Sequence, residues 1–245
     1  MRFTALLVCA VAAMTDTPQA RTARAVLGRR LAAGGVLLVV AAGLVGVVAA
    51  DVTRGTRLPA IDIEVANWLH RHATPPLVTA MLVWTQLHST VAVGAYAAVA
   101  ALVLALERNW RHATLVVVAV GGGLAVNALM KLTFHRARPS FDDPVLTLAT
   151  YSFPSGHVAG STIFYGLAVA AVFARTTHAR WRAFAVVAAL LAIALVAFSR
   201  MLLGVHYLSD VVAAFAEGTV WLTFSLGALA MIGRDAANDR AAEPA

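Results

Sequence analysis

The stretch Lys131-Leu-Thr-Phe-His-Arg-Ala-Arg138-Pro139 places a lysine at the end of a strongly apolar run and an arginine in the polar segment that follows. Two further polar clusters lie at the edges of apolar runs in the same way. They are Pro154-Ser-Gly-His157 and the group of Ser199-Arg200, His206 and Asp210. Apolar runs of about 20 residues span a bilayer as helices. The sequence therefore predicts membrane-crossing helices with polar clusters at their ends.

The composition supports this interpretation. Hydrophobic residues make up 60% of the 245 positions, and charged residues make up only 13%. A soluble domain of this length normally carries about a quarter charged residues. Backbone groups in hydrocarbon must be satisfied within their own segment, and the Ala-, Leu- and Val-rich runs lack the alternation of a barrel. We therefore predict an all-α, polytopic membrane bundle without a second soluble domain.

The apolar runs predict six membrane-crossing helices, at residues 31–50, 76–106, 113–132, 156–174, 183–199 and 207–232. The second run is long for one crossing, so part of 76–88 is expected to lie obliquely or at the interface. Segment 53–75 carries an amphipathic pattern, which predicts either an interfacial helix or a plain connector. The whole forms one membrane domain, 31–232, between an N-terminal segment, 1–30, and a tail, 233–245.

The first residues do not fit this plan. Met1-Arg2 precedes an apolar stretch that reaches Met14, and Ala10-Val11-Ala12 loosely resembles a signal-peptidase site. Cleavage there would disagree with the arginines that precede the first predicted helix. We therefore expect residues 1–13 to be an artificial upstream start, with Met14 as the initiator.

The net charge of +7 comes from cations in short segments between the apolar runs, with no basic face or tail. This distribution is typical of membrane topology rather than of nucleic-acid binding. With both termini in the cytoplasm, twelve of the nineteen Lys and Arg residues fall inside and seven outside. This excess predicts that orientation and puts the three polar clusters on the extracytoplasmic face. The single cysteine, Cys9, excludes an internal disulfide and a Cys-based metal site.

His206 and Asp210 are four residues apart, so on a helix they would share one face. The carboxylate would then hold one ring nitrogen and leave the other free to attack. Arg200, at the end of the preceding predicted helix, is able to reach the same place. Alone, the pair favours a structural contact over a nucleophile.

The cluster Pro154-Ser-Gly-His157 stands where a loop becomes a predicted helix. Ser155 is suited to cap that helix, and Gly156 lets a ligand approach the backbone. Free amides at a helix N-terminus bind anions. His157 would lie beside such an anion and protonate a departing oxygen, although the same four residues also make a good helix start.

Lys131 and Arg138 supply a flexible cation and a forked guanidinium, which are complementary phosphate ligands. The alternative is a lysine that extends to the interface and an arginine that sets topology. Lys131 is the only lysine in the chain, which favours the ligand role. Asn127 and Glu217 should face the bundle interior, as structural partners or along a substrate path. No metal-ligand spacing is present, so no metal or other cofactor is predicted.

Taken in order, the clusters resemble the three-part motif of the type 2 phosphatidic acid phosphatase (PAP2) superfamily, which includes acid phosphatases and vanadium haloperoxidases. The K-x6-R-P part matches Lys131 to Pro139, and the P-S-G-H part matches Pro154 to His157. The S-R-x5-H-x3-D part matches Ser199 to Asp210. Every motif position is present over about 80 residues, and the six-span layout extends the similarity along most of the chain.

The resemblance implies a phosphohistidine intermediate at His206, oriented by Asp210. His157 would protonate the leaving group and then help to activate water. Fixed cations would stabilise the transferring phosphoryl group in place of metal ions. The residues implied to hold the phosphate oxygens are Lys131, Arg138, Ser155, Gly156 and Arg200.

The implied function is metal-independent hydrolysis of a membrane lipid phosphate or diphosphate at the outer membrane surface. Polyprenyl diphosphate, phosphatidic acid and phosphatidylglycerol phosphate are the candidate substrates, and an outward-facing site favours the polyprenyl carrier. The alternatives are a lipid phosphotransferase, a vanadium haloperoxidase, and a non-catalytic protein that binds or transports lipid phosphates. The expected partners are the bilayer and the lipid substrate, and the oligomeric state is left open.

Overall fold

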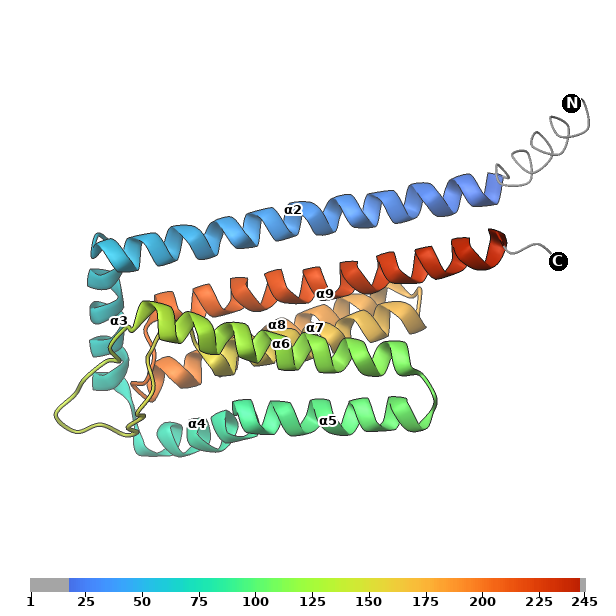
Figure 1. Ribbon diagram of the computed structural model, residues 1–245. Helices are drawn as coiled ribbons and strands as arrows, with labels where there is room; N and C mark the ends of the chain where they lie inside the picture. The colour runs from blue at the N-terminus through green and yellow to red at the C-terminus, as the bar shows by residue number, and fades with distance from the viewer. Residues whose placement is uncertain (1–17, 243–245) are drawn as a thin grey trace, which may run out of the picture.

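The computed structural model describes the chain from residue 18 to residue 242, and over that range it contains helices and no strands (Figure 1). The prediction of an artificial start at residues 1–13 lies outside the described residues. The helices, in chain order, are α2 (Pro18–Arg54), α3 (Leu58–His72), α4 (Pro75–Leu87), α5 (Thr90–Leu106), α6 (Trp110–Phe134), α7 (Gly156–Arg175), α8 (Ala179–Leu202) and α9 (Leu208–Ala242).

Six segments of the described chain are long and apolar enough to cross a membrane. Their outward faces carry exposed apolar side chains, such as Val39, Leu106 and Leu191, as helices in contact with lipid do. The predicted all-α bundle with six spans is therefore confirmed, with ends close to those expected. The segments are Ala32–Arg54, Pro75–Leu106, Trp110–Phe134, Gly156–Arg175, Ala179–Leu202 and Leu208–Met231.

The long second span is built from two helices. Helix α4 ends at Leu87, and Ser89 caps α5 by accepting a hydrogen bond from the amide of Ala92 at 3.1 Å. His88, at the break, is buried, and its Nε2 lies 2.7 Å from the hydroxyl oxygen of Tyr165. This contact satisfies a polar ring inside the bundle. The separate helix α4 accounts for the excess length of the segment.

Helix α3 runs across one end of the bundle, whereas the long helices run along it (Figure 1). Trp68 and Ile63 are 53% and 54% exposed, but Leu69 and Asp62 on the opposite side are buried. The buried side packs against α8 and α9. The amphipathic helix expected within segment 53–75 is therefore present, and the plain connector is not.

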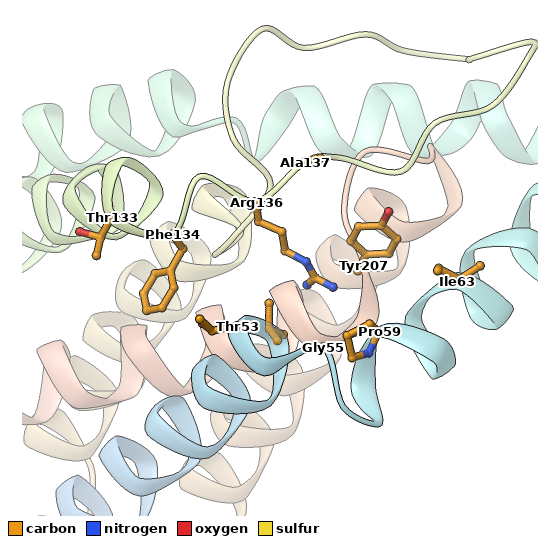
Figure 2. Close-up of a pocket in the computed structure, with 10 residues that line it drawn as sticks. Thr53, Gly55, Pro59, Ile63, Thr133, Phe134, Arg136, Ala137 and Tyr207 are labelled. Carbon is orange, nitrogen blue, oxygen red and sulfur yellow. The ribbon is translucent and has the colours of Figure 1, made fainter.

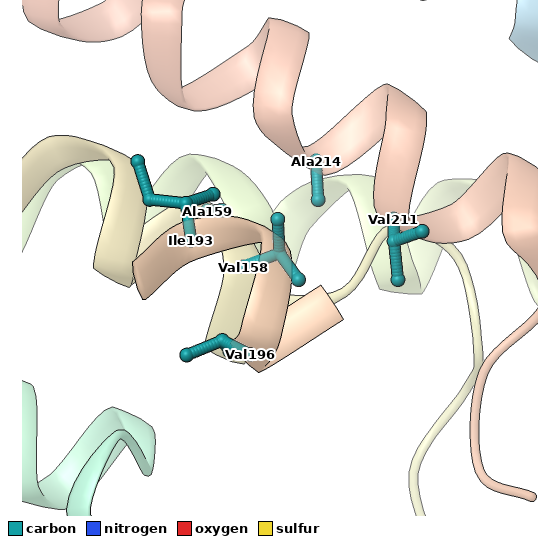
Figure 3. Packing of buried hydrophobic residues seen from close by; sticks show 6 residues of the cluster. All are labelled: Val158, Ala159, Ile193, Val196, Val211 and Ala214. Atoms are coloured by element: carbon teal, nitrogen blue, oxygen red, sulfur yellow. The ribbon is translucent and has the colours of Figure 1, made fainter. Parts of the chain in front are cut away.

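Helix α7 lies at the centre of the packing, in contact with α5, α6, α8 and α9. An added Cβ at Gly123 of α6 would lie 2.2 Å from Cδ1 of Ile163 on α7, so the two helices approach closely because this position has no side chain. A buried core joins α7, α8 and α9 and fixes the ends of these helices relative to one another (Figure 3). It consists of Val158, Ala159, Ile193, Val196, Val211 and Ala214.

This packing brings the three motif segments together. The end of α6, the start of α7, the end of α8 and the start of α9 all lie at the end of the bundle that α3 crosses (Figure 1). The described beginning of α2 and the described end of α9 lie at the opposite end (Figure 1). The polar clusters that are far apart in the sequence therefore share one end of the bundle.

Candidate active site

His206 lies in the turn between α8 and α9, because α9 begins only at Leu208. The predicted shared helix face of His206 and Asp210 is therefore replaced by a turn, which Gly204 allows through its positive φ of 68°. The two side chains still face each other, with Nδ1 of His206 3.4 Å from Oδ2 of Asp210. This distance exceeds that of an ordinary hydrogen bond, and Nδ1 has no other partner.

The second ring nitrogen of His206 faces a cation. Nη1 of Arg138 lies 3.2 Å from Nε2 of His206. A guanidinium only donates hydrogen bonds, so Nε2 must accept and the proton resides on Nδ1, toward Asp210. Burial lowers the pKa of His206 to about 3, despite the opposing effect of Asp210. The ring is therefore neutral at physiological pH, and its unprotonated nitrogen points to the guanidinium of Arg138.

Lys131 and Arg138 are held by carbonyl groups of the loop that joins α6 to α7. Nζ of Lys131 donates to the carbonyl of Tyr151 at 2.8 Å. Arg138 donates to the carbonyls of Thr150 at 2.6 Å and Val205 at 2.5 Å. Burial lowers the pKa of Arg138, and the charge of Asp210 opposes that effect. The loop and the turn before α9 are thus joined around the ring of His206.

Arg200 and Ser155 retain unused hydrogen-bonding atoms at this place. Arg200 is 2% exposed and donates through Nη1 to Oγ1 of Thr85 at 2.8 Å, but its Nε has no partner. Oγ of Ser155 is also buried without a partner. The predicted side-chain cap by Ser155 is absent, and its amide donates to the carbonyl of Asp210 at 3.2 Å. Buried donors without acceptors are costly, and oxygens of a bound anion would satisfy them.

His157 lies in the first turn of α7. The charges of Lys131, Arg138, Arg200 and His206 are close enough to act on its ring. Gly156, beside it, leaves space for the neighbouring helix, since an added Cβ would lie 3.1 Å from Oδ1 of Asn127. The structure therefore brings the residues predicted from all three motifs to one place. We call the five residues expected to hold a phosphate, together with the expected acid His157, the phosphate cradle: Lys131, Arg138, Ser155, Gly156, His157 and Arg200.

A second polar cluster adjoins Asp210, and the three motifs did not predict it. Nη1 of Arg136 donates to Oδ1 of Asp210 at 2.6 Å, and Nη2 donates to Oδ2 of Asp62 at 2.7 Å. Ser209 and Ser152 complete the cluster through hydrogen bonds to Asp62 and Asp210 respectively. We call Asp62, Arg136, Ser152, Ser209 and Asp210 the Arg136 network. A carboxylate within the amphipathic segment 53–75 is the one local feature that could have drawn attention to Asp62, and no prediction from the sequence used it.

Asn127 of α6 and Glu217 of α9 are hydrogen-bonded to each other inside the bundle. Nδ2 of Asn127 donates to Oε2 of Glu217 at 2.9 Å, and both residues are buried. Of the two roles expected for them, the structural partnership is the one the contacts support. Among the described residues, no group of three or more His, Cys, Asp and Glu side chains could hold a metal ion.

A cavity of about 680 Å³ opens between the end of α2, the start of α3 and the segment after α6 (Figure 2). Arg136 and Tyr207 form part of its wall, with Cζ of Arg136 4.4 Å from the centre of the Tyr207 ring. The remaining wall is mostly apolar and includes Pro59, Ile63 and Phe134. No cradle residue lines this cavity, so it is separate from the phosphate cradle.

The fold and the site together define a polytopic helical protein with a cluster of cationic side chains beside a neutral histidine. A sequence profile described as the PAP2 superfamily matches residues 112–233, which contain all three motifs, and the chain belongs to that superfamily. No curated protein matches the chain.

Two solved structures share the fold. One is described as the first transmembrane PAP2 type phosphatidylglycerolphosphate phosphatase from Bacillus subtilis, with 22% identity, a TM-score of 0.66, and coverage of 78% of this chain and 94% of that one. The other is LpxE from Aquifex aeolicus, with 19% identity, a TM-score of 0.52, and coverage of 68% of this chain and 95% of that one. At these identities the likeness establishes the fold.

Proposed function

We propose that this protein is an integral membrane lipid phosphatase that hydrolyses a lipid phosphomonoester or diphosphate through a phosphohistidine at His206. The observation that carries the proposal is the contact between Nη1 of Arg138 and Nε2 of His206. It sets a phosphate-binding cation against the nitrogen that would attack. The unpartnered Nε of Arg200 and Oγ of Ser155 add donors for the phosphate oxygens.

In the first half of the reaction, Nε2 of His206 attacks the phosphorus atom and the bond from phosphorus to the leaving oxygen breaks. His157 gives its proton to that oxygen. The ring of His206 gains positive charge as the new bond forms, and Asp210, facing Nδ1, stabilises that charge. The cradle cations offset the negative charge of the phosphoryl oxygens without having to reorganise.

In the second half, the now neutral His157 takes a proton from water, and the resulting hydroxide attacks phosphorus. The bond between phosphorus and nitrogen breaks, phosphate leaves, and His206 returns to its neutral form. His157 thus acts first as an acid and then as a base. Replacement of water by an alcohol would give a phosphotransferase.

The proposed substrates are polyprenyl diphosphate, phosphatidic acid and phosphatidylglycerol phosphate, with the polyprenyl carrier favoured for an outward-facing site. Phosphate release by the detergent-purified chain across this panel tests the proposal, with His206→Ala as the matched control. Turnover that His206→Ala lacks would support it. Transfer to added alcohols would indicate a phosphotransferase, bromide oxidation after vanadate loading a haloperoxidase, and binding without turnover a transport or receptor role.

The proposed location is the cell membrane, with both termini cytoplasmic and the site extracytoplasmic. The excess of arginine on the presumed inner side supports this orientation. Single cysteines at Thr176 and Asp142, in a Cys9→Ser background, should respond oppositely to an impermeant thiol reagent in intact cells. Labelling at Asp142 with protection at Thr176 is expected, and the reverse pattern would place the site on the cytoplasmic side.

A further inference from the structure

The Arg136 network links the helix that crosses the bundle end to the aspartate that faces His206. Asp62 lies on the buried side of α3 and accepts three hydrogen bonds. These come from Nη2 of Arg136 at 2.7 Å, from the amide of Ser209 at 2.9 Å and from Oγ of Ser209 at 2.5 Å. Asp62 therefore holds both the guanidinium of Arg136 and the first turn of α9.

Both carboxylates of the network are buried, with Asp62 1% and Asp210 0% exposed. Arg136 lies between them as their shared counter-charge. Burial disfavours the charged form of Arg136, but the negative charges of Asp210 and Asp62 outweigh it and raise the pKa of the guanidinium. Removal of either carboxylate would therefore change the balance of charge at the other.

The hydrogen bonds also fix the orientation of Asp210. Its Oδ1 accepts from Arg136 at 2.6 Å. Its Oδ2 accepts from the amide of Tyr207 at 2.9 Å and from the hydroxyl of Ser152, and the same oxygen faces Nδ1 of His206. The carboxylate thus has no freedom to rotate away from the imidazole. Asp62 itself is not in contact with His206 or the cradle, so any effect on chemistry must pass through Arg136 and Ser209.

We propose that Asp62 and Arg136 are positioning residues for phosphoryl transfer, through which helix α3 holds Asp210, and hence the His206 imidazole, in its reactive orientation. The proposal rests on the proposed phosphatase function. It assigns α3 a role in catalysis as well as in packing, because the buried face of this helix supplies the carboxylate that locks the guanidinium. A misplacement of about 1 Å at a reacting group costs roughly 100-fold in rate.

The test compares Asp62→Asn with Asp51→Asn. Asp51 is a second carboxylate that holds α3, since its Oδ2 accepts from the amide of Leu58 at 2.7 Å, but it does not contact the network. Asp62→Asn should lower kcat by about 10- to 100-fold and leave KM within about twofold, since substrate binding rests on the cradle. Asp51→Asn should retain the kcat of the original chain. Equal kcat values for the two variants, both folded, would overturn the proposal.

Arg136→Lys supplies a variant that keeps the charge in the network. A lysine has no planar fork to join two carboxylates, so kcat should fall while the protein stays folded. A direct readout is the ¹⁵N spectrum of the histidine rings. His206 of the original chain should carry its proton on Nδ1, whereas Asp62→Asn and Arg136→Lys should show a mixture of tautomers. An unchanged tautomer in both variants would also overturn the proposal.

The ring spectrum separates this proposal from the proposed function. If the purified chain releases no phosphate from any lipid but the variants still change the His206 tautomer, the phosphatase assignment fails and the positioning contact stands. If the chain is active and neither kcat nor the tautomer responds to Asp62→Asn, the positioning role fails alone.

Discussion

The phosphate cradle and the Arg136 network are neighbouring polar clusters at the same end of the bundle, but their hydrogen bonding differs. In the network, all four carboxylate oxygens of Asp62 and Asp210 accept hydrogen bonds. In the cradle, Nε of Arg200 and Oγ of Ser155 are buried without partners. Because unsatisfied buried polar atoms are rare in folded proteins, the difference separates a cluster that holds the structure from one suited to an external anion.

Charge distinguishes the two clusters in the same way. The network has two carboxylates around one guanidinium, whereas the cradle gathers the cations Lys131, Arg138 and Arg200 without a carboxylate among its own residues. A phosphate would balance the positive charge of the cradle. A further anion would add to the negative charge of the network, where two carboxylates already surround one guanidinium. Asp210 belongs to the network, while the imidazole that it faces borders the cradle. His206 is therefore where the two clusters meet, and the predictions below test each side of it.

The largest effect is expected from His206→Ala. This variant removes the group that would carry the phosphoryl unit, so turnover should fall by about 10⁴-fold or more. An acid-labile, base-stable phosphoenzyme should form in the original chain and be absent in the variant. His178→Ala is the matched control, because this exposed histidine precedes α8 at the opposite end of the bundle. A phosphoenzyme that persists in His206→Ala would refute the assignment.

The sequence was sufficient to predict the six spans and the gathering of the motif residues for a physical reason. Apolar runs of membrane length are read directly along the chain, and the motif residues mark the helix ends that gather at one site. The partners of these residues were not predictable in the same way. Asp62 and Arg136 are 74 positions apart, and their pairing depends on α3 turning across the bundle, which no local pattern encodes. The expected helical pairing of His206 with Asp210 failed locally, because the turn at Gly204 supplies the contact instead.

A second effect, of about 10- to 100-fold, is expected in the affinity for a phosphate-like anion when Arg200 is changed to Gln. The variant removes a buried guanidinium whose Nε is free to bind an oxygen, and a hydrogen bond to a charged group contributes about 1.5–3 kcal/mol. The inhibition constant for vanadate measures this loss. Arg182→Gln is the control, since Arg182 bonds only to the carbonyls of Thr176 and Phe173. Unchanged vanadate inhibition in Arg200→Gln would place the anion elsewhere.

A smaller effect is expected in the pH dependence of stability. Burial lowers the pKa of His206 from 6.5 to about 3 in the folded chain. The unfolded chain therefore binds a proton at His206 more readily than the folded chain does. The contribution of the neutral His206 to the free energy of unfolding is fully present above pH 6.5 and is lost as the pH falls toward 3. Between pH 7 and pH 5 the loss should be about 2 kcal/mol.

Thermal unfolding in detergent at these two pH values measures the loss in the original chain and in His206→Asn. The variant has no imidazole to protonate, so its melting temperature should fall less on acidification. Equal pH responses of the two proteins would show that His206 is not held neutral by burial.

The smallest effect, none within error, is expected from chelation. In the proposed site, Lys131, Arg138 and Arg200 already offset the charge of the phosphoryl oxygens, which is the part that metal ions take in other phosphoryl transfers. The carboxylates of the Arg136 network, Asp62 and Asp210, are engaged by Arg136 and are not free to act as ligands. Phosphate release should therefore be equal with and without an excess of chelator. Activity that falls on chelation and returns with a divalent ion would mean that the cradle cations are not sufficient, and that the division between the two clusters is wrong.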